Sequence, residues 1–218
     1  MAYPSIISQP ARNLQPVLEA LSPLIEGSNA KRVLELASYP YEHIRGYAQK
    51  WSDVQFTGTV RDDKEINTTN TTDLPSNVGR PLRLDIAEEG DWAALTDATA
   101  EPYDGVVMLN LVHCTPEGLP ENIFRNLSPK LKTGRRVLAP GGWVAAYGAY
   151  LNDDGSFRSP ADAKFDAEYI KGMHPSLGLR TPKSITAMAE TWGFREVERK
   201  DMPKGNLWIV WKVEEVEE

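Results

Sequence analysis

The sequence predicts an α/β fold built on a mostly parallel β-sheet, and three observations support this prediction. Apolar stretches typical of buried strands alternate along the chain with stretches in which apolar residues have helical spacing. Strands that alternate with helices form parallel sheets, because each helix carries the chain back across the sheet. The last two predicted strands, 194–202 and 206–213, are separated by only three residues, and such a short connection requires an antiparallel pair.

The predicted elements follow one another in a regular order. The first is an amphipathic helix at 13–26. Residues 32–37 are almost continuously apolar, which is typical of a strand buried on both faces of a sheet. The Pro-Gly-Gly sequence at 140–142 predicts a turn. The other predicted strands are 53–60, 81–86, 103–112 and 143–150, and the other predicted helices are 41–51, 120–132, 160–173 and 182–193.

The composition predicts one domain spanning 1–218, because 218 residues with 41% hydrophobic content suffice for one full core. Segment 151–181 is rich in Gly, Pro and Asp at its ends, and we expect it to act as a partial lid. The net charge of -7 disfavours a nucleic-acid partner, because a phosphate backbone repels such a surface on average. No apolar run approaches the roughly 20 residues of a membrane span, so no membrane partner is expected.

The cysteine content predicts a reducing compartment. Cys114 is the single cysteine, which excludes a disulfide within the chain. The first residues lack the charged and apolar regions of a secretory signal, so we expect a cytoplasmic location. Trp192, Trp208 and Trp211 can serve either a core or an interface, which leaves a homodimer open.

The strand pattern indicates a particular α/β plan. Five parallel strands followed by an antiparallel hairpin are the usual arrangement of the Rossmann-like class I methyltransferase fold, with seven strands and helices on both faces. The chain also resembles the small methyltransferase-like protein 26 family over nearly its whole length. That resemblance implies S-adenosylmethionine (SAM) as the ancestral cofactor and substrates that are largely unassigned. The segments that carry it are ARN (11–13), RVLEL (32–36), NVGRPLRLD (77–85), YDGVVMLNLVH (103–113), APGGWVAAYGAY (139–150), FRSPADAKFD (157–166), HPSLGLR (174–180) and MPKGNLWIV (202–210).

The turn after the first strand departs from the family. There the family reads roughly Gly-Ser-Gly-Thr-Gly-Gln-His, and the three glycine positions are Ala37, Tyr39 and Tyr41 in this chain. Glycine in such a turn adopts a positive φ without cost and lets a ligand lie against the backbone. The two phenols stand where the methionine part of SAM is expected, and Pro40 removes a backbone donor. The pattern therefore predicts that no cofactor is bound, with SAM as the alternative.

The end of the second strand shows a second departure. The family carries an acidic residue there to grip the ribose hydroxyls, and the alignment places Val60 at that position. Asp62 or Asp63 substitutes for it if the loop is shifted. If SAM is bound, Glu35, Ala37 and Asp85 are the expected cofactor residues. The alternative is that the carboxylates of Glu35 and Asp85 only accept hydrogen bonds from nearby loop amides, and the two interpretations are equally supported.

Ligands of open α/β sheets bind beyond the carboxyl ends of the strands, and this edge defines the predicted site. His113, which titrates near neutrality, and Tyr147, a hydrogen-bond donor, are the predicted catalytic residues. The alternatives are a packed or capping histidine and an ordinary core tyrosine; His43 is favoured as a surface or capping residue. No His or Cys spacing resembles a metal-ligand set, so no metal is expected. The predicted substrate-binding residues are Arg12, Asn13, Tyr39, Tyr41, Asn110, Tyr150 and Arg180.

Three functions remain open, all of them with a small molecule as the partner. The first is a methyltransferase fold of specialised metabolism that no longer methylates and instead cyclises, isomerises or dehydrates its substrate by acid/base chemistry. The second is a SAM-dependent methyltransferase with an unusual turn. The third is a non-catalytic binding protein, whose signature is a collapsed pocket. The steric argument about Tyr39 and Tyr41 favours the first. Arg12 and Arg180 suit an acidic or enolic substrate, or alternatively pair with Asp166.

Overall fold

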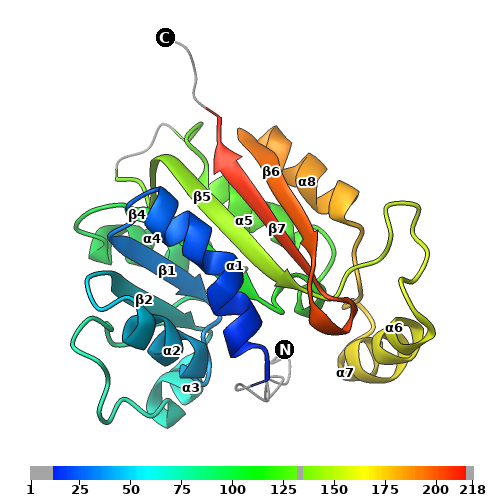
Figure 1. The fold of residues 1–218 in the computed structure, drawn as a ribbon, viewed down its shortest axis with the longest axis horizontal. Coiled ribbons are helices and arrows are strands. Elements are labelled where there is room, and N and C mark those ends of the chain that lie inside the picture. Colours follow the sequence, from blue (N-terminus) through cyan, green and yellow to red (C-terminus); the bar gives the residue numbers. More distant parts are fainter. Residues whose placement is uncertain (1–11, 132–134, 215–218) are drawn as a thin grey trace.

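The computed structural model describes residues 12–131 and 135–214, and its centre is one seven-stranded sheet (Figure 1). The strand order is β3-β2-β1-β4-β5-β7-β6. Strand β7 is antiparallel to both β5 and β6, and the pairs among β1 to β5 are parallel, so the prediction of a mostly parallel sheet with an antiparallel terminal pair is confirmed. The strands are β1 (Arg32–Leu36), β2 (Gln55–Val60), β3 (Leu82–Arg83), β4 (Tyr103–Leu109), β5 (Leu138–Gly148), β6 (Phe194–Asp201) and β7 (Leu207–Val213).

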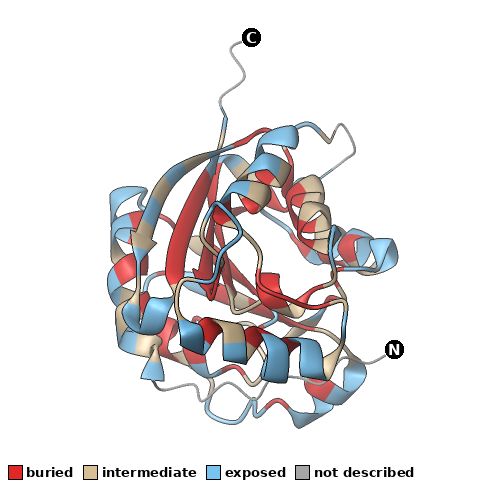
Figure 2. Ribbon diagram, turned by 90° about the vertical axis from the view of Figure 1, so that its right-hand side faces the viewer, coloured by how far each residue is buried: buried red, intermediate tan, exposed pale blue. Residues whose placement is uncertain are grey.

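Helices cover both faces of the sheet. The helices are α1 (Leu14–Gly27), α2 (Glu42–Lys50), α3 (Asp63–Thr68), α4 (Glu89–Ala98), α5 (Leu119–Leu127), α6 (Pro160–Lys164), α7 (Lys171–Met173) and α8 (Pro182–Thr191). Helices α1 and α2 pack on one face, and α4, α5 and α8 pack on the other. Figure 2 shows the consequence: buried residues occupy the sheet and the inner sides of the helices, whereas the outer sides are exposed.

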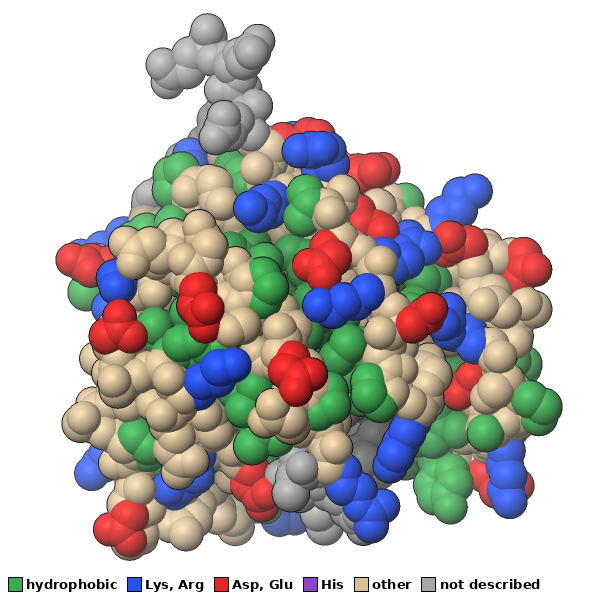
Figure 3. Space-filling view, in the orientation of Figure 1, with side chains coloured by type: hydrophobic (Ala, Val, Ile, Leu, Met, Phe, Trp, Pro, Cys, Tyr) green, Lys and Arg blue, Asp and Glu red, His purple; other side chains and the backbone are tan. Residues whose placement is uncertain are grey.

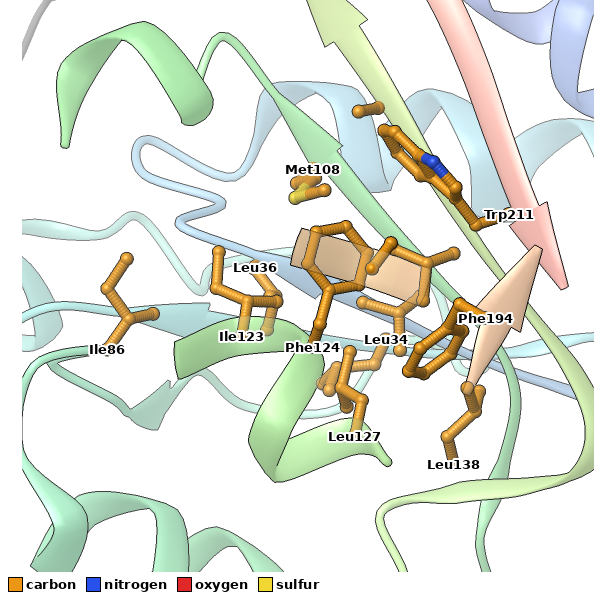
Figure 4. Packing of buried hydrophobic residues seen from close by; sticks show 14 of the residues in the cluster. Leu34, Leu36, Ile86, Met108, Ile123, Phe124, Leu127, Leu138, Phe194 and Trp211 are labelled. Carbon is orange, nitrogen blue, oxygen red and sulfur yellow. The ribbon is translucent and has the colours of Figure 1, made fainter. Parts of the chain in front are cut away.

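Strand β1 contributes to both cores because its side chains alternate between faces. Val33 packs with α1 and α2, whereas Leu34 and Leu36 pack with the helices of the opposite face. Figure 4 shows this second core, in which the Phe124 ring makes edge contacts with Trp211 at 5.3 Å and with Phe194 at 5.5 Å between ring centroids. Trp208 is also fully buried, so these tryptophans serve the core.

One local prediction is wrong, one holds with an irregularity, and two helices were not predicted. The Pro-Gly-Gly at 140–142 lies within β5, where the pairing register with β4 shifts and Gly141 takes a φ of 70°. The helix predicted at 160–173 is confirmed over these residues, and its central segment, η3 (Phe165–Ile170), is π-helical. Helices α3 and α4 were not predicted; α3 is only six residues long, and α4 buries only Trp92 and Leu95, so neither has a strong apolar periodicity.

The surface carries no single-sign charge field on the face seen in Figure 3, where basic and acidic side chains are interspersed. Within residues 12–131 and 135–214, no helix combines the length and apolar character needed to cross a membrane. The carboxyl ends of the parallel strands lie at one edge of the sheet. The arrowheads of β1 and β5 point toward this edge, and α6 and α7 lie beyond it (Figure 1).

Candidate functional site

A cavity of about 750 Å³ opens at the carboxyl ends of the parallel strands, where α/β folds bind ligands. One half lies at the ends of β1, β2 and β3 and is lined by carboxylates, including those of Glu35, Asp62 and Asp85. The other half lies between the start of α1, the end of β5 and the β6–β7 turn, and it is lined by Arg12, Asn13, His43, Tyr147, Lys204 and Asn206. This open cavity differs from the collapsed pocket expected of a non-catalytic relic.

The turn after β1 keeps the backbone shape that its missing glycines would favour. Ala37 and Tyr41 have φ values of 53° and 77°, in the left-handed region that non-glycine residues rarely adopt. Hydrogen bonds hold the turn against β2: the Ala37 N–H donates to Thr59 Oγ1 at 3.1 Å, and the Ser38 N–H donates to the Thr59 carbonyl at 2.7 Å. The left-handed conformations are therefore stabilised by the neighbouring strand rather than by glycine.

The side chain of Tyr41 lies outside the cavity, which corrects the prediction that it blocks the cofactor position. Tyr41 is fully buried beneath the turn, and its hydroxyl group accepts from the Gly58 N–H at 2.9 Å and lies 3.1 Å from the Gly58 carbonyl. Gly58 makes this possible, because a Cβ there would lie 2.5 Å from the Tyr41 ring. Of the two tyrosines in this turn, only Tyr39, which is half-buried, lines the cavity. The steric argument against SAM therefore loses one of its two phenols.

Glu35 presents a buried and only partly satisfied carboxylate to the cavity. It is 3% exposed, and its Oε1 accepts from the Tyr47 hydroxyl at 3.2 Å. Its Oε2 has no hydrogen-bond partner among the described residues. Burial raises the pKa of Glu35 to about 7, and the nearby Ser38 and Tyr47 hydroxyl groups oppose this shift; the Ser38 hydroxyl itself donates to the Glu35 backbone carbonyl at 2.9 Å. A buried carboxylate oxygen without a partner indicates a place for a ligand donor.

The acidic edge of the cavity continues beyond β2 and β3. Val60 is fully buried in the core and does not line the cavity, whereas Asp62 does. Asp62 is the N-cap of α3 and accepts from the Glu65 N–H at 2.9 Å. Asp85 also lines the cavity and accepts from the Ala87 N–H at 3.0 Å, so it satisfies a loop amide and faces the cavity at the same time.

A polar network joins four segments in the other half: the start of α1, α2, β5 and the β6–β7 turn. The Nε2 atom of His43 lies 2.8 Å from Asn13 Oδ1, and Asn13 also forms a side-chain hydrogen bond with Tyr147. Asn206 Nδ2 donates to the Tyr147 hydroxyl oxygen at 2.9 Å. Although Asn13 is the N-cap residue of α1, its side chain makes no capping bond and serves this network instead. His43, which the sequence favoured as a surface or capping residue, is therefore a buried member of the site.

His113 follows β4 in a short 3₁₀ turn (Val112–Cys114) and lines the cavity. Burial lowers its pKa to about 4, and a hydrogen bond with the Ala149 backbone opposes this shift. The imidazole is thus neutral near pH 7, and its Nδ1 has no hydrogen-bond partner among the described residues. Phe165 of η3 contacts the ring edge-on at 5.7 Å between centroids, so the segment predicted to act as a lid contributes one wall.

The sequence profile of a family described as "Protein of unknown function (DUF938)" matches residues 6–213. The chain belongs to the DUF938 family. The narrower resemblance to the methyltransferase-like protein 26 family stays a prediction.

Solved structures place the fold of this DUF938 protein among class I methyltransferases. An O-methyltransferase family protein from Burkholderia thailandensis has a TM-score of 0.71 at 14% identity, covering 94% of this chain and 57% of its own. Human N-acetylserotonin methyltransferase, solved with SAM, has a TM-score of 0.68 at 15% identity, covering 94% and 52%. An O-methyltransferase described as putative, from Nostoc punctiforme, has a TM-score of 0.68 at 18% identity, covering 92% and 56%. The predicted fold class is confirmed, and the DUF938 chain spans a little over half the length of these proteins.

Two of the predicted substrate-binding residues of the DUF938 chain lie outside the cavity. Tyr150 is 1% exposed and packs in the core beside α5 and α8, outside the cavity. Arg180 does not line the cavity, because its guanidinium donates to backbone carbonyls, including those of Gly178 and Thr115. Asp166 pairs with Lys171 instead of either predicted arginine.

The remaining predicted residues lie on the cavity wall. Asn110 is there with a φ of 54°, and its N–H donates to the Tyr147 carbonyl at 2.7 Å. Cys114 also lines the cavity, and burial raises the pKa of its thiol to about 12, which makes it a poor nucleophile. Among the residues that the structure describes, no group of three or more His, Cys, Asp or Glu side chains is arranged to hold a metal ion.

Proposed function

We propose that this DUF938 protein is a SAM-dependent methyltransferase that acts on a small molecule. The observation that carries the proposal is the open cavity at the carboxyl ends of the strands, with the unpartnered Glu35 carboxylate oxygen in its acidic half. The methyltransferase fold and the human structure solved with SAM support it as analogies. The position of the Tyr41 phenol in the core removes one of the two phenols that argued against it.

The residues of the acidic half fit the cofactor. SAM carries a cationic amino group and sulfonium, a carboxylate, a ribose with two hydroxyls, and an adenine ring. Glu35 would accept from the amino group, and Asp62 would accept from the ribose hydroxyls in place of an acid at the end of β2. Leu84, Ile86 and Leu111 provide apolar surface for the ring. When bound, SAM supplies an activated methyl group.

The other half of the cavity contains the side chains that would bind the methyl acceptor and accept its proton. His113 is neutral at physiological pH, so its free nitrogen can accept a hydrogen bond or a proton from an acceptor hydroxyl, amine or carbon, with a basicity that burial lowers below that of a free imidazole. Tyr147 is held by two carboxamide side chains and orients an acceptor by hydrogen bonding. Phe165 from the lid-like segment shields the histidine from water.

Calorimetric titration of the purified protein with S-adenosylhomocysteine (SAH) tests the proposal. We expect saturable binding, and we expect Glu35→Gln and Asp62→Asn to weaken it about tenfold each, the loss of one charge-assisted hydrogen bond. Glu101→Gln, an exposed carboxylate outside the cavity, is the matched control. Absence of binding at millimolar SAH would contradict the proposal.

A second candidate function has one observation in its favour. Tyr39 remains on the cavity wall in a turn without glycine. If its phenol excludes SAM, His113 and Tyr147 remain available for a cyclisation, isomerisation or dehydration that needs no methyl donor. Replacing Tyr39 by Gly separates the candidates: it should create SAH binding only if the phenol blocks the cofactor, and should leave existing binding nearly unchanged otherwise.

A further inference from the structure

The cations that line the cavity fall into two pairs with different surroundings. Arg61 and Arg83, in the acidic half, are both engaged by carboxylates. Arg61 lies 3.6 Å from Asp62, and Arg83 lies 3.3 Å from Asp91. Their charges are therefore already balanced by the protein, so they contribute little net attraction for an anionic ligand.

Arg12 and Lys204 line the opposite half without such balance. Across residues 12–131 and 135–214, neither forms an ion pair or a side-chain hydrogen bond. Lys204 has a φ of 63° in the turn between β6 and β7. Two exposed cations that line one cavity without an ion-pair partner among these residues favour a negatively charged ligand group there.

Both cations are sequence neighbours of residues that bond the same hydroxyl group. Arg12 immediately precedes Asn13, and Lys204 lies two residues before Asn206. The side chains of these two asparagines both hydrogen-bond Tyr147. Arg12 and Lys204 therefore belong to two segments that are anchored at the same hydroxyl group, and both residues line the cavity that Tyr147 also lines.

The orientation of the Tyr147 hydroxyl follows from its partners. Asn13 Oδ1 faces the His43 Nε2, which leaves the Asn13 amide NH₂ for Tyr147, and Asn206 also donates through its NH₂. A phenol oxygen that accepts two hydrogen bonds has used its lone pairs and still has its own hydrogen to donate. Arg12, Lys204 and Tyr147 thus offer donors only.

We infer that the methyl acceptor carries an anionic oxygen group, a carboxylate or a phosphate, that binds among Arg12, Lys204 and the Tyr147 hydroxyl. This inference builds on the proposed function, in which the acidic half holds the cofactor and leaves this half for the acceptor. The nearby Leu109 and Phe165 side chains add apolar surface, so the rest of the acceptor is aromatic or otherwise apolar.

Binding of matched probe pairs to the SAH-saturated protein tests the inference. The pairs are 4-hydroxybenzoate with 4-hydroxybenzamide, and indole-3-carboxylate with indole-3-carboxamide, with phenyl phosphate as the phosphate arm. We expect each anion to bind at least about tenfold more tightly than its neutral amide. Tighter binding of phenyl phosphate than of the carboxylates would identify phosphate as the group, and the reverse would identify carboxylate.

Variants assign the preference to the named residues. The double variant Arg12→Gln/Lys204→Gln should abolish the preference for anions and leave SAH affinity unchanged. Tyr147→Phe should weaken anion binding severalfold, again without a change in SAH affinity. Lys183→Gln/Arg195→Gln removes the same charges from exposed positions outside the cavity and should behave like the parent protein.

The failures of the two proposals are distinguishable. If SAH binds but no anionic probe binds more tightly than its neutral partner, the inference about the acceptor is overturned and the methyltransferase proposal stands. If the anions are preferred but the double variant keeps that preference, the assignment to Arg12 and Lys204 is overturned. Failure of SAH itself to bind overturns the proposed function.

Discussion

The phenol of Tyr41 occupies the space that Gly58 leaves empty on the neighbouring strand. The Gly58 N–H donates to the phenol oxygen at 2.9 Å, and a Cβ on Gly58 would lie 2.5 Å from the ring. Tyr41 is thereby turned away from the cavity, although it stands at a position where the related turn carries glycine. The pair explains how a turn without glycine can border an open ligand cavity.

Gly58→Ala should therefore destabilise the protein. The new Cβ would also lie 2.6 Å from Ser38 Oγ, so the turn has to move or the ring has to leave its place. We expect a loss of about 1–3 kcal/mol in the free energy of unfolding, which lowers the melting temperature by several degrees in a chain of this size. Gly90→Ala in α4, where a Cβ meets nothing within 4 Å, is the control and should be neutral or slightly stabilising.

The affinity for SAH should rise with pH because Glu35 ionises near neutrality. Burial raises the pKa of Glu35 to about 7, so its carboxylate is largely protonated at pH 6 and largely ionised at pH 8. Only the ionised form attracts the ammonium group of SAH fully. Titration calorimetry at both pH values should show tighter binding at pH 8, and Glu35→Gln should remove this difference. An equal pH dependence in the variant would assign it to another group.

Glu35 should also make the free energy of unfolding depend on pH. Its pKa is higher in the folded state than the ordinary value of 4.5, so the folded protein binds more protons between these values. The stabilising contribution is present below pH 4.5 and is lost as the pH rises through about 7. Denaturant unfolding should therefore show Glu35→Gln gaining stability relative to the parent between pH 5 and pH 8.

His113 should produce a slope of the opposite sign. Burial lowers its pKa from 6.5 to about 4, so the unfolded chain binds more protons between these values. The contribution to stability is present above pH 6.5 and is lost as the pH falls toward 4. We expect His113→Gln to lose less stability than the parent on acidification from pH 7 to pH 5. Lys183→Gln, on the exposed side of α8, should follow the parent.

Cys114 should react slowly with thiol reagents. Burial raises the pKa of its thiol to about 12, so very little thiolate is present at pH 8. Labelling with a disulfide reagent at pH 8 should be at least about a hundredfold slower in the native protein than in denaturant. Rapid labelling of the native protein would show that the cavity wall opens to expose the thiol.

Sequence pattern was sufficient for the architecture because periodicity and connection length are local properties. The alternation of apolar strands with helices specified the parallel sheet, and the three-residue link at 203–205 specified the antiparallel pair. Where the local signal was weak, the prediction was wrong. Helix α4 buries only Trp92 and Leu95, and the glycines at 141 and 142 sit inside β5, where pairing with β4 tolerates an irregular register.

The site was predictable as an edge of the sheet but not as a set of side chains. Tyr39 and His113 follow strands and Tyr147 lies at the end of one, so all three were placed at the carboxyl edge from the sequence. Whether a side chain turns into a cavity or into the core depends on what a strand distant in the sequence leaves free. Gly58 lies seventeen residues beyond Tyr41, and its missing side chain is what draws the phenol inward. The place of His43 in the site also depends on a distant residue. Asn13, thirty residues away, makes no capping bond and instead hydrogen-bonds the His43 ring.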